Sequence, residues 1–242
     1  MLSSERMPRY SIGIDLGGTN LRAAAFDDAG KLLKKVSGQT PVTHGPEAVI
    51  ADMASAAAQL RDEFGADSMA GIGVGVPGNI DMQRGVVVAW NNVPSFNGYP
   101  TRDKLSALLN TTVILENDAN AAAIGEHWAG AGKGVDDLVM LTLGTGIGGG
   151  IITRGRIVHG HVGMAGELGH ITVVPNGNPC GCGNSGCVEK YASATAIAAM
   201  ARNLNLGQIT ALDVQRLAEQ GNPRALAIWR SAGEHLGIAL AT

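Results

Sequence analysis

Three cysteines and one histidine have the residue types and the spacing of a zinc site. Cys180, Cys182 and Cys187 are the only cysteines in the chain, and His170 lies ten residues before the first of them. An odd number of cysteines cannot all pair as disulfides, and Cys180 and Cys182 are too close in sequence to bridge comfortably. Three thiolates and one imidazole would complete a closed tetrahedral site. We therefore expect a structural Zn²⁺ here; the alternative is three buried or reactive thiols without a metal.

A glycine-rich turn precedes this cluster. The segment Gly144-Thr145-Gly146-Ile147-Gly148-Gly149-Gly150 follows the apolar run 137–143 and leads into a second apolar run, so it is predicted to join strand to strand. Small residues let backbone N–H groups approach a phosphate closely. The segment is neither a Walker loop nor a dinucleotide-binding turn that opens a helix. The pattern alone leaves phosphate contact and a plain tight turn both open.

A second glycine turn lies near the start of the chain. The predicted strand 10–15 ends at Asp15, and Leu16-Gly17-Gly18-Thr19-Asn20 separates it from the strand 21–26. An Asp at a strand end and a Thr after glycines could face a phosphate and its magnesium ion. The alternative is a hairpin in which Asp15 only caps the turn. Two such turns that face each other could grip the phosphates of one nucleotide.

Asn117 and Asp118 stand between a predicted strand at 111–115 and a predicted helix at 119–128. Asn and Asp are preferred N-caps, so capping is one interpretation. A carboxylate in this place could also take a proton from a substrate hydroxyl. The two roles are compatible, so the pattern leaves open capping alone and capping together with proton transfer.

Two loops are further candidates for lining a pocket. Gly78 and Asn79 follow the predicted strand 71–76, and the carboxyl ends of strands in α/β sheets tend to bind ligands. Asn92 lies in a polar loop after the predicted strand 86–90.

Helices and strands alternate along the chain, which predicts an α/β fold. Helix 46–64 has one apolar face and stops at Gly65, and helix 101–109 has Thr101 as its predicted N-cap. Residues 171–174 are strand-like. Further helices are predicted at 191–203, after Thr210 in a capping box, and after Asn222-Pro223. The expected apolar face of the last helix consists of Leu226, Trp229, Ala232, Leu236 and Ala239.

Composition places the chain among globular proteins. It has 242 residues, 45% of them hydrophobic, and a net charge of −3, which argues against a nucleic-acid or anionic-membrane partner. No apolar run approaches the length of a membrane span, and the polar N-terminus lacks the apolar core of a signal peptide. Clustered, unpaired cysteines fit a reducing compartment, so we expect a cytoplasmic protein.

Five motifs, taken in order, resemble those of the ROK family of sugar kinases, and within it the bacterial glucokinases. The resemblance runs from about Tyr10 to the end of the chain. The matching residues are Asp15-Leu16-Gly17-Gly18-Thr19-Asn20, Glu116-Asn117-Asp118-Ala119-Asn120-Ala121, Leu143 to Gly150, Gly166-Glu167-Leu168-Gly169-His170, and Cys180-Gly181-Cys182-Gly183 through Cys187-Val188-Glu189.

The resemblance implies an actin-like ATPase (ribonuclease H-like) fold, with two α/β domains and the active site in the cleft between them. It implies that Asp118 is the general base, and that His170 serves both the zinc and the sugar. The implied sugar-binding residues are Asn117, Asp118, Glu167, His170 and Glu189, to which the loops add Gly78, Asn79 and Asn92. Those implied to hold Mg-ATP are Asp15, Gly17, Gly18, Thr19, Asn20, Gly144, Thr145, Gly146, Gly148 and Gly149.

The function implied is transfer of the γ-phosphoryl group of Mg-ATP to the 6-hydroxyl of glucose. An N-acetylglucosamine, N-acetylmannosamine or other hexose kinase is the alternative within the family, because the named contacts do not settle position 2 of the sugar. A sugar-responsive repressor is a rival from another class. It would need a DNA-binding domain before the first hairpin, where only about ten residues stand. A non-catalytic sugar-binding fragment is the third possibility.

We expect two domains, 1–117 with the first phosphate loop and 118–242 with the second phosphate loop and the zinc loop. The resemblance implies that family members continue beyond Thr242 with the last strands of the second domain, and the last helix has no C-cap signal. The chain is therefore expected to be C-terminally truncated relative to the family. The resemblance also suggests a homodimer.

Overall fold

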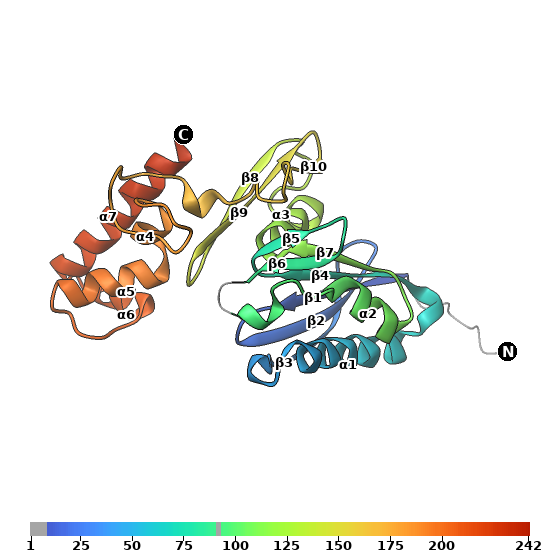
Figure 1. Cartoon of the computed structure of the whole chain (residues 1–242). Coiled ribbons are helices and arrows are strands. Elements are labelled where there is room, and N and C mark those ends of the chain that lie inside the picture. The colour runs from blue at the N-terminus through green and yellow to red at the C-terminus, as the bar shows by residue number, and fades with distance from the viewer. Residues whose placement is uncertain (1–8, 91–92) are drawn as a thin grey trace. The chain divides into compact units, whose positions relative to one another are not determined.

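The computed structural model describes residues 9–90 and 93–242, which form two compact units (Figure 1). One unit comprises Met1–Leu138 and Ile152–Met164, and the other comprises Val139–Ile151 and Ala165–Thr242. The first unit continues past position 118, where the sequence predicts the boundary between two domains. The division into domains 1–117 and 118–242 remains a prediction. Each unit has its own apolar core.

A five-stranded mixed sheet forms the centre of the first unit. Its order is β3-β2-β1-β4-β7, with antiparallel pairing among the first three strands and parallel pairing of β1 with β4 and β4 with β7. The predicted glycine hairpin is therefore confirmed as the connection between β1 and β2. The strands are β1 (Tyr10–Leu16), β2 (Asn20–Asp27), β3 (Leu32–Gln39), β4 (Met69–Val76) and β7 (Val113–Asn117).

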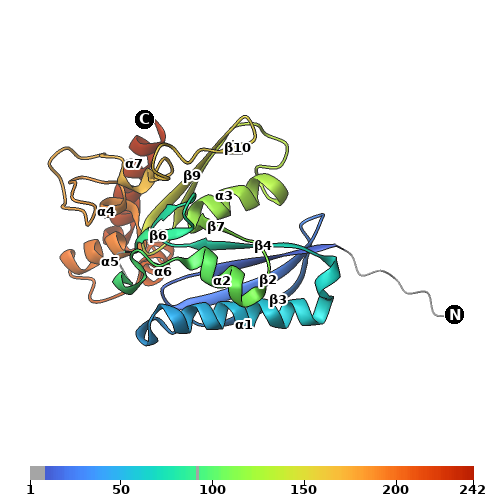
Figure 2. The same cartoon turned by 45° about the vertical axis from the view of Figure 1, so that its right-hand side comes forward.

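Helices cover both faces of this sheet. Figures 1 and 2 show α1 (Pro46–Phe64) and α2 (Thr101–Leu109) on one face and α3 (Asp118–Ala129) on the other. The prediction for α1 is confirmed in its bounds and its face, since Val49, Met53 and Leu60 are fully buried against the sheet. A small ladder of β5 (Asn79–Asp81) with β6 (Val86–Ala89) completes the unit, together with the 3₁₀ turns η1 (Val42–His44), η2 (Ala66–Ser68) and η3 (Pro94–Phe96).

Gly75 on β4 sets how closely α3 approaches the sheet. A Cβ atom on Gly75 would lie 3.4 Å from both the Cα of Asp118 and the Cβ of Ala121. The absence of a side chain there lets the first turn of α3 lie directly against the strand. Asp118 is thereby held at the carboxyl end of the sheet.

The predicted cap of α2 is wrong. The N-cap is Pro100, and Thr101 is a fully buried first helical residue whose hydroxyl donates to the Tyr99 carbonyl at 3.4 Å. An N-cap side chain would instead accept from a backbone N–H of the first turn. Pro100 suits its place because it has no N–H that needs a partner.

The second unit contains most of the glycine hairpin of β8 (Leu138–Leu143) and β9 (Ile147–Thr153), followed by four helices, whereas the end of β9 from Ile152 and the strand after it belong to the first unit. β9 also pairs with the short β10 (Arg156–Ile157), so the three strands follow the order β10-β9-β8. The helices are α4 (Glu189–Ala192), α5 (Ala194–Asn203), α6 (Ala211–Glu219) and α7 (Pro223–Leu240), and η4 (Leu168–His170) is a 3₁₀ turn. Their core includes Val188, Ile197, Val214 and Ile228.

Two predictions about backbone structure in this unit are wrong. Residues 171–174 form only an isolated bridge, because the N–H groups of Val173 and Val174 both bond to the carbonyl of Gly186 in the cysteine loop. The helix expected over 191–203 is interrupted at Ser193, which has an extended backbone and caps α5 by accepting from the Ala196 N–H. The capping box of α6 at Thr210 and the Asn222 cap of α7 are confirmed.

The first half of the apolar face predicted for α7 is also wrong. Leu226 and Trp229 are 47% and 37% exposed, whereas Ala225 and Ile228 are buried. Ala232, Leu236 and Ala239 do pack on the core as expected. The prediction assigned the larger side chains, Leu226 and Trp229, to the buried face. In the structure, the residues one position earlier face the neighbouring helices. No helix among the described residues combines the length and the apolar character needed to cross a membrane.

Candidate functional site

Asn117 connects the end of β7 to the start of α3. Its side-chain oxygen accepts from the N–H groups of Ala119 at 2.9 Å and Asn120 at 3.0 Å, so it is the N-cap of α3 as predicted. Its amide nitrogen donates to the carbonyl of Gly78 at 3.2 Å. Asp118 follows as the first helical residue, and its Oδ1 accepts from the Ala119 N–H at 2.8 Å. The helix N-terminus favours negative charge at this position.

The loop at Gly78 and Asn79 lies beside this junction. Gly78 has φ 88°, and a Cβ atom there would lie 2.1 Å from the carbonyl oxygen of Ala89. Only glycine satisfies both constraints. The bond from Asn117 thus brings together two predicted substrate residues that are far apart in sequence. Asn79 begins β5, and Asn92 lies outside the described residues.

The first glycine hairpin is closed by backbone bonds and held from one side by Thr40, which the sequence analysis missed. The Gly17 N–H donates to the Asn20 carbonyl at 2.8 Å, while the Thr40 hydroxyl donates to the Gly17 carbonyl and the Thr40 N–H to the Thr19 carbonyl. No atom lies within 4 Å of where a Cβ of Gly18 would stand, so this turn is open to a ligand.

Asp15 lies opposite Arg22 in the β1–β2 register and accepts from its guanidinium at 3.0 Å. Both side chains are about half exposed. The pair is open to solvent and contributes little to stability, so Asp15 can exchange this partner for another cation.

The second glycine hairpin is held by residues just after the cysteine loop. The carbonyl of Gly144 accepts from the Ala194 N–H at 2.9 Å, and that of Thr145 from the Thr195 hydroxyl at 2.7 Å. Within the hairpin, the Gly148 N–H donates to the Thr142 hydroxyl at 3.1 Å. These bonds use the carbonyls of Gly144 and Thr145 and the N–H of Gly148, which fixes the backbone of the turn.

Glu189 contacts the same hairpin, a partnership that the sequence did not reveal. Its Oε2 accepts from the Ile147 N–H at 2.9 Å and would lie 2.4 Å from a Cβ on Gly146. A predicted sugar residue and a predicted phosphate loop are therefore in direct contact.

The turn η4 packs against β9 through glycine. A Cβ on Gly169 would lie 1.9 Å from the carbonyl oxygen of Ile147, and one on Gly149 would lie 2.7 Å from the side chain of Leu168. Because Glu167 is the N-cap of this turn and His170 is its last residue, their positions are tied to the glycine hairpin.

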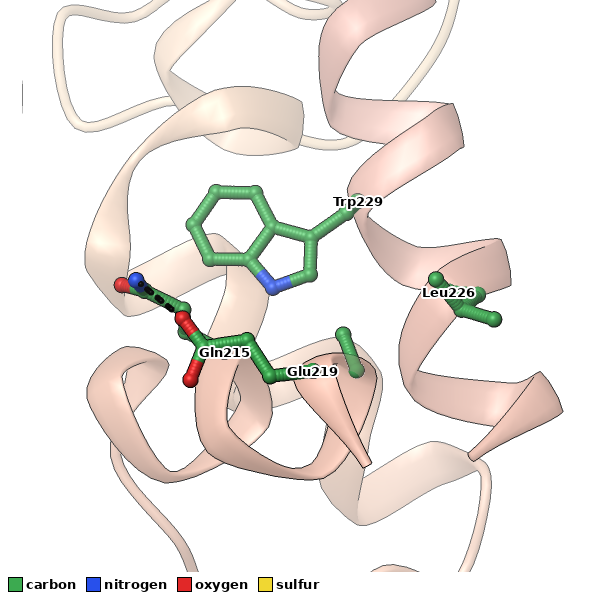
Figure 3. Close-up of a pocket in the computed structure, with 5 residues that line it drawn as sticks. Gln215, Glu219, Leu226 and Trp229 are labelled. Carbon is green, nitrogen blue, oxygen red and sulfur yellow. Dashed lines mark hydrogen bonds between the residues drawn. The ribbon is translucent and has the colours of Figure 1, made fainter. Parts of the chain in front are cut away.

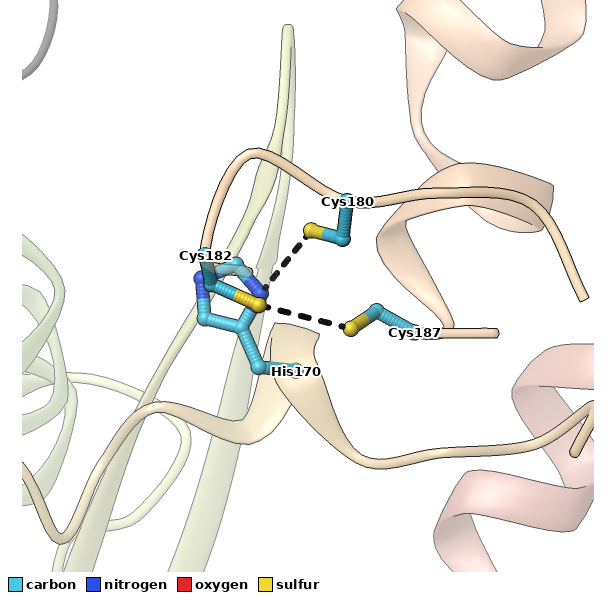
Figure 4. A group of neighbouring side chains, drawn as sticks. All are labelled: His170, Cys180, Cys182 and Cys187. Atoms are coloured by element: carbon cyan, nitrogen blue, oxygen red, sulfur yellow. Dashed lines mark hydrogen bonds between the residues drawn. The ribbon is translucent and has the colours of Figure 1, made fainter. Parts of the chain in front are cut away.

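His170 and the three cysteines converge as the sequence predicts (Figure 4). Cys180 Sγ lies 3.5 Å from His170 Nδ1, Cys182 Sγ lies 3.7 Å from Cys187 Sγ, and all four donor atoms are within 4.8 Å of one another. Tetrahedral zinc, with bonds of about 2.3 Å to sulfur and about 2.0 Å to nitrogen, separates its ligand atoms by similar distances. The donors therefore fit a closed four-coordinate metal site.

The environment of Cys187 favours a neutral thiol unless a cation is bound nearby. Burial, together with the neighbouring Cys180 and Cys182, raises the pKa of the Cys187 thiol to about 12. The N–H of Asn184 lowers the pKa of the exposed Cys182. A buried thiol of this kind becomes a thiolate when a bound cation supplies the compensating charge.

The two ring nitrogens of His170 have different neighbours. Nδ1 faces Cys180, while Nε2 lies 3.7 Å from Glu167 Oε2. A metal bound at Nδ1 would fix the ring and leave Nε2 for a polar partner. This division is the one expected for a residue with two roles.

A pocket of about 420 Å³ lies elsewhere, on α6 and α7, and Figure 3 shows its lining. It is lined by Gln215, Ala218, Glu219, Leu226 and Trp229, and Gln215 donates to Glu219 at 3.0 Å. None of the predicted site residues lines this pocket.

A family model described as "ROK family" matches residues 11–242. The chain belongs to the ROK family. It is 45% identical over 192 residues to the glucokinase of Thermotoga maritima, and the match covers 79% of this chain but 60% of that protein. It is 39% identical to the glucokinase of Halalkalibacterium halodurans, with 96% of this chain and 76% of that protein covered.

Among solved structures, the chain resembles a ROK family glucokinase from Streptomyces griseus in complex with glucose and AMPPNP. The TM-score is 0.81 and the identity 35%, with 96% of this chain and 78% of that chain covered. The expected actin-like ATPase fold is thereby confirmed. The chain thus spans between about three fifths and about four fifths of the length of these relatives.

Proposed function

We propose that the protein is an ATP-dependent hexose kinase of the glucokinase type, which phosphorylates glucose at its 6-hydroxyl. The observation that carries the proposal is the Asn117–Asp118 junction, where a carboxylate stands at a helix N-terminus beside the loop at Gly78. The identity of 39–45% to two glucokinases supports glucose over other acceptors.

Asp118 is the proposed general base. It accepts the proton of the sugar 6-hydroxyl as that oxygen attacks the γ-phosphorus of ATP, and ADP leaves with the electron pair of the broken bond. Little covalent chemistry is needed from the protein in such a reaction, so positioning and charge neutralisation supply most of the rate.

Other residues of the chain orient the two substrates. The proposed sugar contacts are Asn117, Gly78, Asn79, Asn92, Glu167, His170 and Glu189. The glycine hairpins at 17–20 and 144–149 would bind phosphates through backbone N–H groups other than those of Gly17, Gly144 and Gly148, which donate within the hairpins. Asp15 stands by the first hairpin for the magnesium ion. The contact of Glu189 with Ile147 would let one element respond to both sugar and phosphate.

We further propose that the metal at His170, Cys180, Cys182 and Cys187 is a structural Zn²⁺. Four protein ligands leave no open coordination position, so the ion supplies rigidity to the His170 ring and takes no part in the phosphoryl transfer. On the family resemblance we also propose a homodimer, and we propose a cytoplasmic location because the three clustered cysteines are not paired in disulfides.

A coupled assay of ADP formation tests the proposal. The 242-residue chain is supplied with Mg-ATP and, in turn, glucose, N-acetylglucosamine, N-acetylmannosamine, mannose and fructose. We expect the highest kcat/KM with glucose. A higher kcat/KM with an N-acetylated sugar would instead identify the alternative kinase of the same family. A folded, zinc-loaded chain that turns over none of these sugars would favour the third possibility, a non-catalytic sugar-binding fragment.

A further inference from the structure

Glu116 is the only charged residue among the buried side chains in the described parts of the chain. It lies on β7 immediately before Asn117 and Asp118, and it is 9% exposed. A buried carboxylate is costly unless its oxygens accept hydrogen bonds. The hydrogen-bond partners of Glu116 therefore show which residues fix its carboxylate and which residues the carboxylate fixes.

One carboxylate oxygen of Glu116 accepts hydrogen bonds from a residue before Asp118 and from a residue after it. Oε1 accepts from the N–H of Asn117 at 2.9 Å and from the side-chain amide of Asn120 at 3.1 Å. Asn120 is 2% exposed and belongs to the first turn of α3. Glu116 thus connects the residue before Asp118 to a residue in the turn after it.

The other oxygen of Glu116 is met by a residue from a distant part of the same unit. His159 Nε2 lies 2.7 Å from Glu116 Oε2, across 43 positions of sequence. The His159 side chain is 34% exposed and that of Glu116 is 12% exposed, so the imidazole closes the accessible side of the carboxylate. A bond this short with a carboxylate is of the strong, charge-assisted kind.

We propose that His159 is a positioning residue, which acts through Glu116 to fix the turn that carries Asp118. The proposal rests on the function proposed above, in which Asp118 is the base. His159 fixes one carboxylate oxygen, so the other oxygen stays aligned with Asn117 and Asn120, and the Asp118 carboxylate keeps its direction. Displacement of a catalytic group by about 1 Å can cost about 10²-fold in rate, so a contact of this kind has a measurable effect.

Three variants separate this role from others. His159→Ala removes the donor, whereas His159→Gln keeps an N–H donor at the same number of bonds from Cα as Nε2. His161→Ala is the matched control, because His161 is an exposed imidazole two residues along the same loop. Circular dichroism and zinc content establish that each chain is folded.

The first readout is steady-state kinetics with glucose and Mg-ATP. We expect His159→Ala to lower kcat by about 10- to 100-fold while both KM values change less than about threefold. We expect His159→Gln to recover most of kcat, and His161→Ala to match the parent chain. An unchanged kcat in folded His159→Ala overturns the proposal. A raised glucose KM with normal kcat also overturns it, since that result would indicate direct sugar binding.

The second readout is independent of activity. Amide hydrogen exchange of peptides that cover 113–123 is expected to be about tenfold faster in His159→Ala and unchanged in the Gln variant. In the Ala variant Glu116 is no longer fixed, so its hydrogen bonds to the Asn117 N–H and to the first turn of α3 open more often. If the parent chain phosphorylates no sugar, the proposed function fails, and exchange still decides the positioning role. Equal exchange in all variants overturns the role of His159 even when the parent chain is an active kinase.

Discussion

Asn117 illustrates how one side chain can be structural and still remain available to a ligand. Its oxygen is occupied by the Ala119 and Asn120 N–H groups, and its amide nitrogen uses one hydrogen on the carbonyl of Gly78. An Asn amide carries two hydrogens, so among the described residues one donor remains. The cap therefore fixes the direction of the remaining N–H, which is the requirement for binding a sugar hydroxyl beside Asp118.

Replacement of the proposed base tests the chemistry at Asp118. Asp118→Asn keeps the size of the side chain and its acceptor oxygen for the Ala119 N–H, but the amide cannot take a proton. We expect kcat to fall by about 10²- to 10⁴-fold while the glucose KM stays within about threefold. Asp28→Asn, at an exposed turn of the same unit, is the control. Normal turnover in Asp118→Asn would exclude the base role.

The buried thiol at position 187 offers the sharpest test of the metal. Cys187 is fully buried, so Ala is the better replacement, because Ser would bury an unpaired hydroxyl. We expect Cys187→Ala to reduce bound zinc from about one per chain to almost none. The three remaining ligands cannot complete the tetrahedral coordination of the ion. Ser185→Ala, in the same loop, should keep its zinc. Metal analysis after gel filtration measures both, and full zinc in Cys187→Ala would contradict the site.

At the scale of elements, sequence patterns predict the structure correctly where residues close in sequence determine it. The ends of α1 follow from Pro46 and from Gly65, whose φ of 84° suits glycine. The caps of α3 and α7 follow from Asn117 and Asn222. The two glycine hairpins and the convergence of the metal ligands were predicted for the same reason, since each depends on residues close in sequence.

The features that sequence could not supply depend on partners far along the chain. The pairing of Glu116 with His159 and of Glu189 with Ile147 joins segments about 40 positions apart, and no local pattern marks them. On α7, Trp229 and Ile228 both fit a helical period, and the packing of α4, α5 and α6 against α7 decides which one is buried.

Gly169 links two elements of the site, which makes it a test at this scale. A Cβ at 1.9 Å from the Ile147 carbonyl forces η4 away from β9, and no rotamer relieves it because both atoms are backbone-fixed. We expect Gly169→Ala to lower the free energy of unfolding by about 1–3 kcal/mol, the usual cost of overpacking, and to raise the glucose KM through Glu167 and His170. Denaturant unfolding and kinetics measure these effects.

Gly181 provides the matched control for this substitution. It lies in the cysteine loop, and nothing stands within 4 Å of its missing Cβ. Gly181→Ala should therefore leave both stability and KM nearly unchanged. If the two Ala variants behaved alike, the effect of Gly169→Ala would come from the residue type, and the contact with Ile147 would not explain it.

On the scale of the whole molecule, the two units have separate cores. One core is built around Ile12, Val74 and Leu115 of the mixed sheet, and the other around Val188, Ile197 and Ile228 of the helices. The metal ligands all belong to the second unit. Chains with more than one core often depart from two-state unfolding, and a metal stabilises the part that binds it.

Removal of zinc should therefore destabilise one unit selectively. The chain has three tryptophans, and Trp90 and Trp128 lie in the first unit while Trp229 lies in the second. In a Trp229→Phe variant, tryptophan fluorescence reports on the first unit alone, whereas far-ultraviolet circular dichroism also follows α4 to α7. We expect a zinc chelator to lower the melting temperature seen by circular dichroism and to leave that seen by fluorescence unchanged, because the lost binding energy belongs to the second core. Equal shifts in both signals would mean that the two cores unfold as one cooperative body.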